Sequence, residues 1–295
     1  MWLSPEHIRK YNSDLMQLFS LYLNLMPREI TPDMVQDLAA DCHISSEEAF
    51  AQLFAALMGV DAGGEGRVFF QCWIRPALHL LDPAPFRTDA YFENVKIGDV
   101  SFGKWELKTE MLAAFEPFVC NDPVVTKEGR MIPQIGFFEE LFPFPAVLEK
   151  GREWMTLQPN EITTAAPALA AAHGRVLTFG LGLGYFVYHA AQKEDVTSVT
   201  AVDISPDVIA LFKKHILPQI PNRHKINLVC RDAFAFADEE MAGNFDFVFA
   251  DIWHDAGDGR ELYLKMKEYE KKHAVIQFTY WLEDTIRCYL DENLW

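Results

Sequence analysis

The chain has 295 residues, of which 50% are hydrophobic and 23% are charged, so a packed globular protein is expected and a disordered one is excluded. Its 43 acidic residues against 26 basic ones give a formal net charge of -17, which repels phosphate backbones and anionic membrane surfaces. We therefore expect neither a nucleic-acid nor a membrane partner, and a small neutral or cationic substrate is the more compatible one.

The first 88 residues are predicted to form a mainly helical accessory region. Apolar residues recur at helical spacing over 15–26, and Pro27 ends this run. Thr31 and Ser45 are typical N-caps for a second and a third helix. The apolar faces of these helices would permit a homodimer.

Residues 89–160 are predicted to form a small mixed segment that contains a hairpin. Stretches 95–100 and 102–107 alternate and hold turn residues, which favours short strands. The aromatic-rich run 137–145 either packs between two domains or forms a wall of a substrate pocket. The polar run 158–161 could reach back over a ligand of the next domain.

Residues 161–295 are predicted to form a Rossmann-like α/β domain. Short buried segments alternate with helical ones, and this order is typical of a doubly wound, mostly parallel sheet with right-handed crossovers. The expected strands are 175–179, 199–203, 226–230, 245–250 and 274–278, and the expected helices are 185–192, 207–215 and 259–271.

A glycine loop lies between the first strand and the first helix of this domain, at Gly180, Gly182 and Gly184. Glycine permits a tight turn and a close approach of the backbone to a ligand, and a helix N-terminus offers free N–H groups. The dinucleotide fingerprint would need glycine or alanine at Tyr185 or Val187 and is therefore not matched.

The spacing G-x-G-x-G resembles the first motif of Rossmann-like S-adenosylmethionine-dependent methyltransferases. Asp203 ends the second strand about 20 residues after the glycines, where a carboxylate can accept both ribose hydroxyls. The resemblance implies that Asp203 and the adjacent Ile204 bind the ribose, and that Asp232 and Ala233 bind the adenine. S-adenosylmethionine is therefore the expected cofactor.

The resemblance also carries departures. The family usually has an acid two positions before the first glycine, where this chain has Thr178, whose hydroxyl could still reach a cofactor amino group. The expected fold is that of a class I methyltransferase, and two further strands typical of this class are expected to be absent.

Within the superfamily, the chain resembles the spermidine-synthase-like branch through its accessory region placed first and its segment 232–234. Polyamine synthases carry Gly-Gly-Gly-Asp-Gly in the loop and Asp-Ser-Ser-Asp after the fourth strand. This chain has His254 at the position of the catalytic acid. Three functions stay open: methyl transfer to a small molecule, aminopropyl transfer, and non-catalytic binding of the cofactor.

The candidate catalytic residues follow the fourth strand and are Asp251, His254 and Asp255. Methyl transfer needs an aligned nucleophile and removal of its proton, for which a histidine or a carboxylate is suited. Trp253 and Tyr280 are the candidate substrate-binding residues. Neither the cysteines nor the histidines show metal-ligand spacing, so no metal is expected. A polar start without a secretory pattern favours a cytoplasmic location.

Overall fold

The structure is a computed structural model that describes residues 3–295, and these residues divide into two compact units. The first unit contains residues 3–83, 111–143 and 287–295, and the second contains residues 84–110 and 144–286. The units therefore do not follow the three consecutive segments 1–88, 89–160 and 161–295 expected from the sequence. The difference arises because the strands within 111–143 pair with a strand of the helical region.

The first unit begins with three helices, each started by a hydroxyl side chain that accepts a hydrogen bond from a backbone N–H group of the first turn. Ser4, Thr31 and Ser45 are these caps, and a proline follows the first two at the start of the helix. The predicted second and third helices are confirmed at these capping residues. The three helices are α1 (Pro5–Leu25), α2 (Pro32–Cys42) and α3 (Ser46–Leu57).

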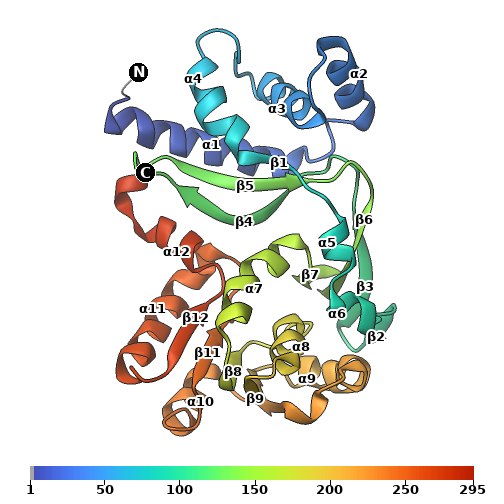
Figure 1. Cartoon of the computed structure of the whole chain (residues 1–295), viewed down its shortest axis with the longest axis vertical. Helices are drawn as coiled ribbons and strands as arrows, with labels where there is room; N and C mark the ends of the chain where they lie inside the picture. Colours follow the sequence, from blue (N-terminus) through green and yellow to red (C-terminus); the bar gives the residue numbers. More distant parts are fainter. Residues whose placement is uncertain (1–2) are drawn as a thin grey trace. The chain divides into compact units, whose positions relative to one another are not determined.

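A three-stranded sheet completes the first unit. Its order is β1-β5-β4, with β1 parallel and β4 antiparallel to the central β5 (Figure 1). Aromatic side chains from α1, α3 and β5 form its core, where Phe19 stacks on Phe54 and Phe50 stacks on Phe137. The remaining elements are α4 (Arg67–Phe69), η1 (Phe70–Ile74), η2 (Arg75–Ala77), β1 (Leu78–Leu80), β4 (Phe118–Val125), β5 (Met131–Phe137), η6 (Glu292–Leu294) and the second half of α12 (Glu283–Leu290).

Asn12 is a fully buried polar residue at the centre of the first unit. Its side-chain oxygen accepts hydrogen bonds from Trp73 Nε1 at 2.9 Å and from the Met131 amide at 3.0 Å. Its amide nitrogen donates to the carbonyl oxygens of Gly129 at 3.0 Å and Leu294 at 2.9 Å. This one side chain therefore joins α1, η1, β5 and the C-terminal turn, with all its hydrogen-bonding capacity used.

The second unit starts with two short helices and a small sheet of order β2-β3-β6-β7. The predicted hairpin is present, but its first strand lies later than expected, at residues 100–102. The elements are α5 (Ala84–Arg87), α6 (Ala90–Asn94), β2 (Val100–Phe102), β3 (Trp105–Leu112), β6 (Phe142–Glu149), β7 (Arg152–Thr156) and α7 (Pro159–Ala171).

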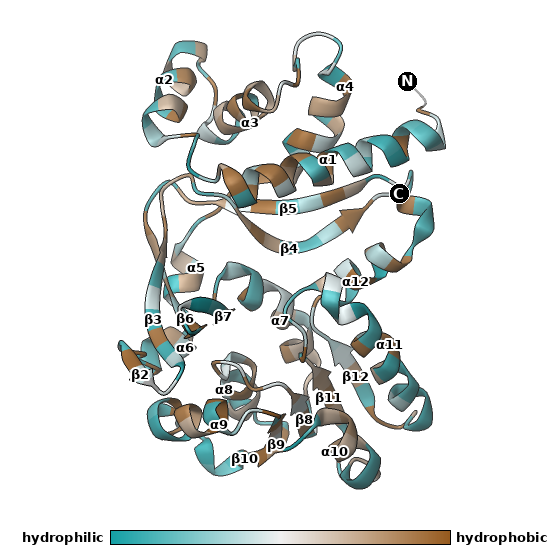
Figure 2. Cartoon of the chain, turned by 180° about the vertical axis from the view of Figure 1, so that it is seen from behind, coloured by the Kyte–Doolittle hydropathy of each residue, from teal (hydrophilic) through white to brown (hydrophobic). Residues whose placement is uncertain are grey.

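The main sheet of the second unit has five parallel strands in the order β10-β9-β8-β11-β12. The α/β prediction of a parallel sheet is confirmed, and its hydrophobic strands β8, β9 and β11 are visible in Figure 2. Among the described residues no strand follows β12. The strands are β8 (Gly174–Phe179), β9 (Val196–Asp203), β10 (Ile226–Cys230), β11 (Phe247–Ala250) and β12 (Gln277–Tyr280).

Helices connect these strands and cover both faces of the sheet. Right-handed crossovers put α8 and α9 on one face and α10 and α11 on the other (Figure 1). The helix α10 was not expected from the sequence, because its segment was interpreted as a ligand-binding loop. The helices are α8 (Tyr185–Gln192), α9 (Pro206–Leu211) with η3 (Phe212–Ile216) and η4 (Leu217–Gln219), η5 (Arg223–Lys225), α10 (Ala233–Glu240) and α11 (Ala256–Lys272).

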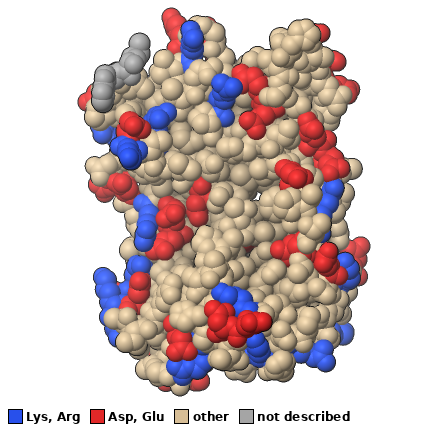
Figure 3. All heavy atoms as spheres, viewed as in Figure 1, with Lys and Arg blue, Asp and Glu red and all other residues tan. Residues whose placement is uncertain are grey.

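The surface shown in Figure 3 carries acidic and basic side chains in small mixed groups. Throughout residues 3–295, no helix combines the length and the apolar character that a membrane crossing requires.

Candidate functional site

The loops after all five strands of the main sheet meet at its carboxyl edge, where ligands bind in open α/β sheets. The strand order reverses between β8 and β11. The connection after β8 and the connection after β11 therefore leave in opposite directions and open a crevice between them. Backbone hydrogen bonds continue past the strand ends, from Gly180 N to Val202 O at 2.9 Å and from Asp251 N to Phe179 O at 2.8 Å. The sheet thereby fixes the glycine loop against the segment that follows β11.

A cavity of about 470 Å³ lies at this edge, within the size range of small-molecule sites. Residues of β7, of α7 and of the five strand-end loops line it, together with Leu262 of α11. The lining residues are Glu153, Trp154, Met155, Thr156, Glu161, Gly180, Leu181, Gly182, Val202, Asp203, Ile204, Ser205, Arg231, Asp232, Ala233, Phe234, Asp251, Ile252, Trp253, His254, Leu262 and Trp281.

The glycine loop is held in a conformation that other residues rarely adopt, with φ of +93° at Gly180 and +49° at Gly182. A Cβ atom on Gly180 would overlap the carbonyl oxygen of Asp251, and one on Gly182 would overlap the side chain of Met155. Gly184, which immediately precedes α8, does not line the cavity, because it faces the ring of Phe212. Two of the three predicted loop glycines therefore reach the cavity.

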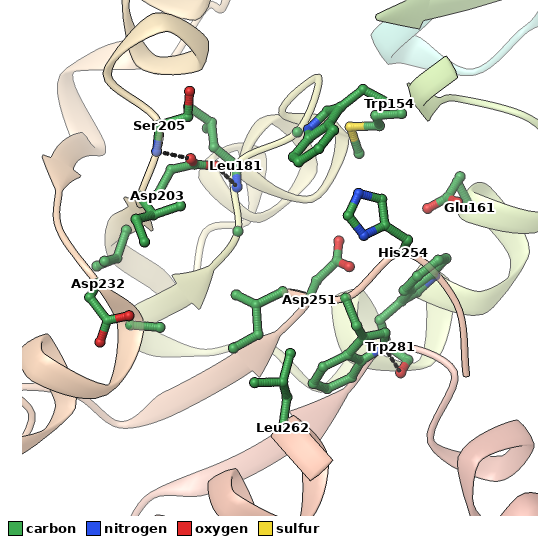
Figure 4. Close-up of a pocket in the computed structure, with 18 of the residues that line it drawn as sticks. Trp154, Glu161, Leu181, Asp203, Ser205, Asp232, Asp251, His254, Leu262 and Trp281 are labelled. Carbon is green, nitrogen blue, oxygen red and sulfur yellow. Dashed lines mark hydrogen bonds between the residues drawn. The ribbon is translucent and has the colours of Figure 1, made fainter. Parts of the chain in front are cut away.

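Asp203 points into the cavity from the end of β9 and is fixed by two backbone donors. Its carboxylate accepts hydrogen bonds from Leu181 N at 3.1 Å and from Ser205 N at 2.8 Å (Figure 4). Burial raises the pKa of Asp203, and these two hydrogen bonds oppose the increase. Ile204 lies beside it with 70% of its surface exposed. The carboxylate keeps acceptor capacity for a ligand with hydroxyl groups.

Asp232 and Ala233 lie where β10 leads into α10, and both line the cavity. One oxygen of Asp232 caps this helix by accepting hydrogen bonds from Phe234 N at 3.0 Å and Ala235 N at 2.9 Å. Within residues 3–295, no donor reaches its other carboxylate oxygen. The residue therefore starts a helix and still presents an acceptor at the cavity.

Asp251 and Glu161 bring two further carboxyl groups to the cavity. Burial, followed by the charge of Asp203, raises the pKa of Asp251 to about 7. Burial, followed by the charge of Asp251, raises the pKa of Glu161 well above its ordinary value. A carboxyl group with a pKa near neutrality can accept a proton at physiological pH, as a general base must.

His254 and two tryptophans form one wall of the cavity. The ring of Trp154 on β7 meets the imidazole of His254 edge-on, with centroids 4.6 Å apart. His254 Nδ1 lies 3.2 Å from a carboxylate oxygen of Asp258. The buried Trp253 donates a hydrogen bond from Nε1 to the carbonyl oxygen of Trp281 at 3.2 Å. Trp253 is thus anchored as a wall, while His254 stays accessible.

Besides Gly184, two of the expected site residues do not line the cavity. Asp255 caps α11, where its carboxylate accepts hydrogen bonds from Gly257 N at 2.6 Å and Asp258 N at 3.1 Å. Tyr280 points away from the cavity and donates a hydrogen bond to Glu270 at 2.9 Å. Side chains alternate along a strand, so its neighbour Trp281 faces the cavity instead.

Several lining residues were missed by sequence reasoning because they precede the glycine loop or lie on a distant helix. Met155 and Trp154 belong to β7, and no motif marks them. The sulfur of Met155 accepts a hydrogen bond from Leu183 N at 3.0 Å. Leu262 is an apolar residue of α11 with no sequence signal for a ligand role. Among residues 3–295, no group of three or more potential ligands could hold a metal ion.

The cavity fits S-adenosylmethionine in its chemistry. The carboxylate of Asp203, which has free acceptor capacity for hydroxyl groups, lies next to the glycine loop. A Cβ atom on Gly180 or Gly182 of this loop would overlap Asp251 or Met155. Ile204, Ala233 and Phe234 supply apolar surface beside Asp232 for a base. Acidic groups suit a ligand that carries a sulfonium and an ammonium group.

Comparison with known proteins agrees with this chemistry. Residues 176–269, less than half of the chain, match a family described as "Methyltransferase domain". No curated protein matches the chain.

Solved structures similar to the chain include the methyltransferase domain of a bacterial protein, CtHen1-C, at 17% sequence identity and a TM-score of 0.29. That similarity covers 39% of this chain and 60% of the other. The methyltransferase domain of bacterial CtHen1-CN is similar at 17% identity and a TM-score of 0.29, covering 39% of this chain and 61% of the other.

Proposed function

We propose that this protein is an S-adenosylmethionine-dependent methyltransferase that acts on a small molecule. The observation that carries the proposal is the position of the Asp203 carboxylate beside the glycine loop, held by the amides of Leu181 and Ser205. These residues lie within the segment that matches a methyltransferase domain.

The proposed cofactor orientation follows from the lining residues. Asp203 accepts hydrogen bonds from the ribose hydroxyls, and Asp232 accepts one from the amino group of the adenine. Ile204 and Phe234 pack against the base. The loop at Gly180 and Gly182 leaves room for the backbone to approach the rest of the cofactor.

The bound cofactor supplies an electrophilic methyl group, and this chain's residues align the acceptor and take its proton. Asp251, with a pKa of about 7, is the proposed proton acceptor. Trp154 and His254 form the wall against which the acceptor packs.

The proposed acceptor is a small molecule of neutral or positive charge. The cavity of about 470 Å³ is lined by five carboxylate side chains, and their negative charge disfavours an anionic acceptor. We infer no nucleic-acid partner from the net charge of -17.

Calorimetric titration tests the proposed cofactor class. We expect S-adenosylhomocysteine to bind and NAD not to bind, and Asp203→Asn to weaken the binding of S-adenosylhomocysteine roughly tenfold or more, through loss of charge-assisted hydrogen bonds to the ribose. Binding of NAD, or an Asp203→Asn variant with unchanged affinity, would contradict the proposal. A preference for methylthioadenosine would favour aminopropyl transfer instead.

A further inference from the structure

The cavity holds carboxyl groups that have no cationic partner in the protein. In the described part of the chain, no donor reaches the carboxylate of Glu161 or that of Asp251. Arg231 is the only lysine or arginine among the described residues that line the cavity, and it pairs with Glu239 and Glu240. Both carboxyl groups are half-buried. An ionised carboxylate that is partly removed from water and has no partner is unfavourable, so this pair of groups at a cavity favours a cationic ligand.

Glu161 lies at the end of the cavity opposite the residues proposed to bind the adenosine. Figure 4 shows Asp232 and Asp203 on one side, Glu161 on the other, and Asp251 between them. Glu161 projects from the first turn of α7. The three carboxylates nearest the glycine loop therefore form a row, Asp203, Asp251 and Glu161, along the cavity.

Glu161 also faces the start of the glycine loop. A small hollow of about 30 Å³ is lined by Glu161, Thr178, Gly180 and Asp251, among others. The hydroxyl of Thr178 is buried and donates its hydrogen bond to the carbonyl oxygen of Gly180 at 3.2 Å. Thr178 is therefore occupied within the loop, whereas the carboxylate of Glu161 is free at the same end of the site.

We propose that Glu161 binds the α-ammonium group of S-adenosylmethionine and so anchors the amino-acid end of the cofactor. This inference rests on the proposed function. A cofactor whose ribose lies at Asp203 extends its amino-acid arm along the row of carboxylates and ends near Glu161. Asp251, in the middle of the row, is left to face the acceptor. The anchor thus comes from a helix before the sheet, and not from the end of β8.

The burial of Glu161 supports this assignment. Its raised pKa arises from loss of water and from the nearby charge of Asp251. An ammonium group placed beside it would offset both effects, because an opposite charge within a few ångströms favours the ionised carboxylate. Glu161 is therefore destabilised without the cofactor and stabilised by it.

The test compares two ligands that differ in one group. Titration calorimetry measures the Kd of S-adenosylhomocysteine and of its des-amino analogue, in which hydrogen replaces the α-amino group. We expect Glu161→Gln to weaken S-adenosylhomocysteine roughly tenfold to hundredfold, which corresponds to the loss of a charged hydrogen bond. The same variant is expected to bind the des-amino analogue with unchanged affinity, which also shows that it is folded.

Glu153→Gln is the matched control, because it removes the same charge from the lining of the same cavity. It is expected to change both affinities less than about twofold, as for a charge screened by solvent. Three results would overturn the inference: equal weakening of both ligands by Glu161→Gln, no weakening of either, or an equal effect of Glu153→Gln. Failure of the unmodified protein to bind S-adenosylhomocysteine would instead refute the proposed function.

Discussion

Replacing Asp251 by asparagine should make the ligand-free protein more stable at pH 8 and leave its stability almost unchanged at pH 4. The cause is the pKa of Asp251, which burial and the charge of Asp203 raise from 3.8 to about 7. Between these two values the folded state keeps a proton that the unfolded state has released. Stability therefore falls as the pH rises through this window and stays low above it.

The size of the effect follows from the difference between the two pKa values. Each pH unit corresponds to about 1.4 kcal/mol, so ionisation of Asp251 costs at most about 4 kcal/mol above pH 7. Asparagine has a similar shape and cannot ionise. For a unit of this size, 1 kcal/mol shifts Tm by about 2–4 °C, so Tm should rise by up to about 16 °C at pH 8.

Thermal unfolding of the ligand-free protein and of Asp251→Asn at pH 4 and pH 8 measures this difference. Asp246 provides a control of opposite sign, because its hydrogen bonds with Arg175 lower its pKa to about 2. Asp246→Asn should therefore lower Tm at pH 8. The groups that face Asp251 are Asp203 and Glu161, and both stay unchanged in these variants. Equal Tm values for Asp251→Asn and the unmodified protein at pH 8 would refute the reasoning.

Three further predictions follow from backbone and buried contacts. Gly180→Ala should lower Tm and abolish binding of S-adenosylhomocysteine in calorimetry, because alanine at a φ of +93° costs roughly 1–3 kcal/mol and its Cβ overlaps the backbone of Asp251. An unchanged Kd would contradict the described loop geometry. Asn12→Leu should lower the free energy of unfolding, measured with urea, by about 4 kcal/mol, since four hydrogen bonds at about 1 kcal/mol each are lost. A decrease of less than about 1 kcal/mol would show that this network contributes little to stability. Asp255→Ala should lower the free energy of unfolding by about 1 kcal/mol through loss of the α11 cap and leave the Kd of S-adenosylhomocysteine unchanged. A large loss of affinity would show that Asp255 contributes to ligand binding.

The sheet and its connections could be predicted from the sequence because their signals are local. The strand 226–230 and the helix 185–192 agree with the structure at both ends. The last strand was expected at 274–278 and lies at Gln277–Tyr280. The apolar run that predicted this strand begins three residues before the first residue that pairs with β11. Composition does not show where pairing begins, because the register of a strand is set together with its partner strand.

The site could be predicted only where strand ends identify it. Asp203 ends β9, Asp251 directly follows β11, and Asp232 lies two residues after β10, so the parallel sheet brings all three to one edge. Asp255 lies further from β11 and caps α11, so its carboxylate is turned away from the cavity. Tyr280 ends β12, and side-chain alternation along this strand directs it away from the cavity. Met155 and Trp154 come from a separate small sheet, and only the three-dimensional structure places them beside the glycine loop.

The division into units could not be predicted, because it depends on pairing between distant segments. Leu78 to Leu80 pair with Ile135 to Phe137, more than 50 residues along the chain. A three-residue strand carries almost no periodic signal of its own. The sequence therefore assigned the segment 111–143 to the intermediate region 89–160. In the structure this segment completes the hydrophobic core around Phe50 and Phe137.

Transfer of a labelled methyl group distinguishes a methyltransferase from a protein that only binds the cofactor. The protein is incubated with S-adenosylmethionine tritiated in its methyl group and with a protein-free extract of small metabolites, and the products are separated by chromatography. We expect label to enter a new small molecule, and Asp203→Asn to reduce this transfer at S-adenosylmethionine concentrations below its Kd. If the protein binds the cofactor and the label stays on it with every fraction of the extract, the protein is a cofactor-binding protein without methyltransferase activity, and the claim fails.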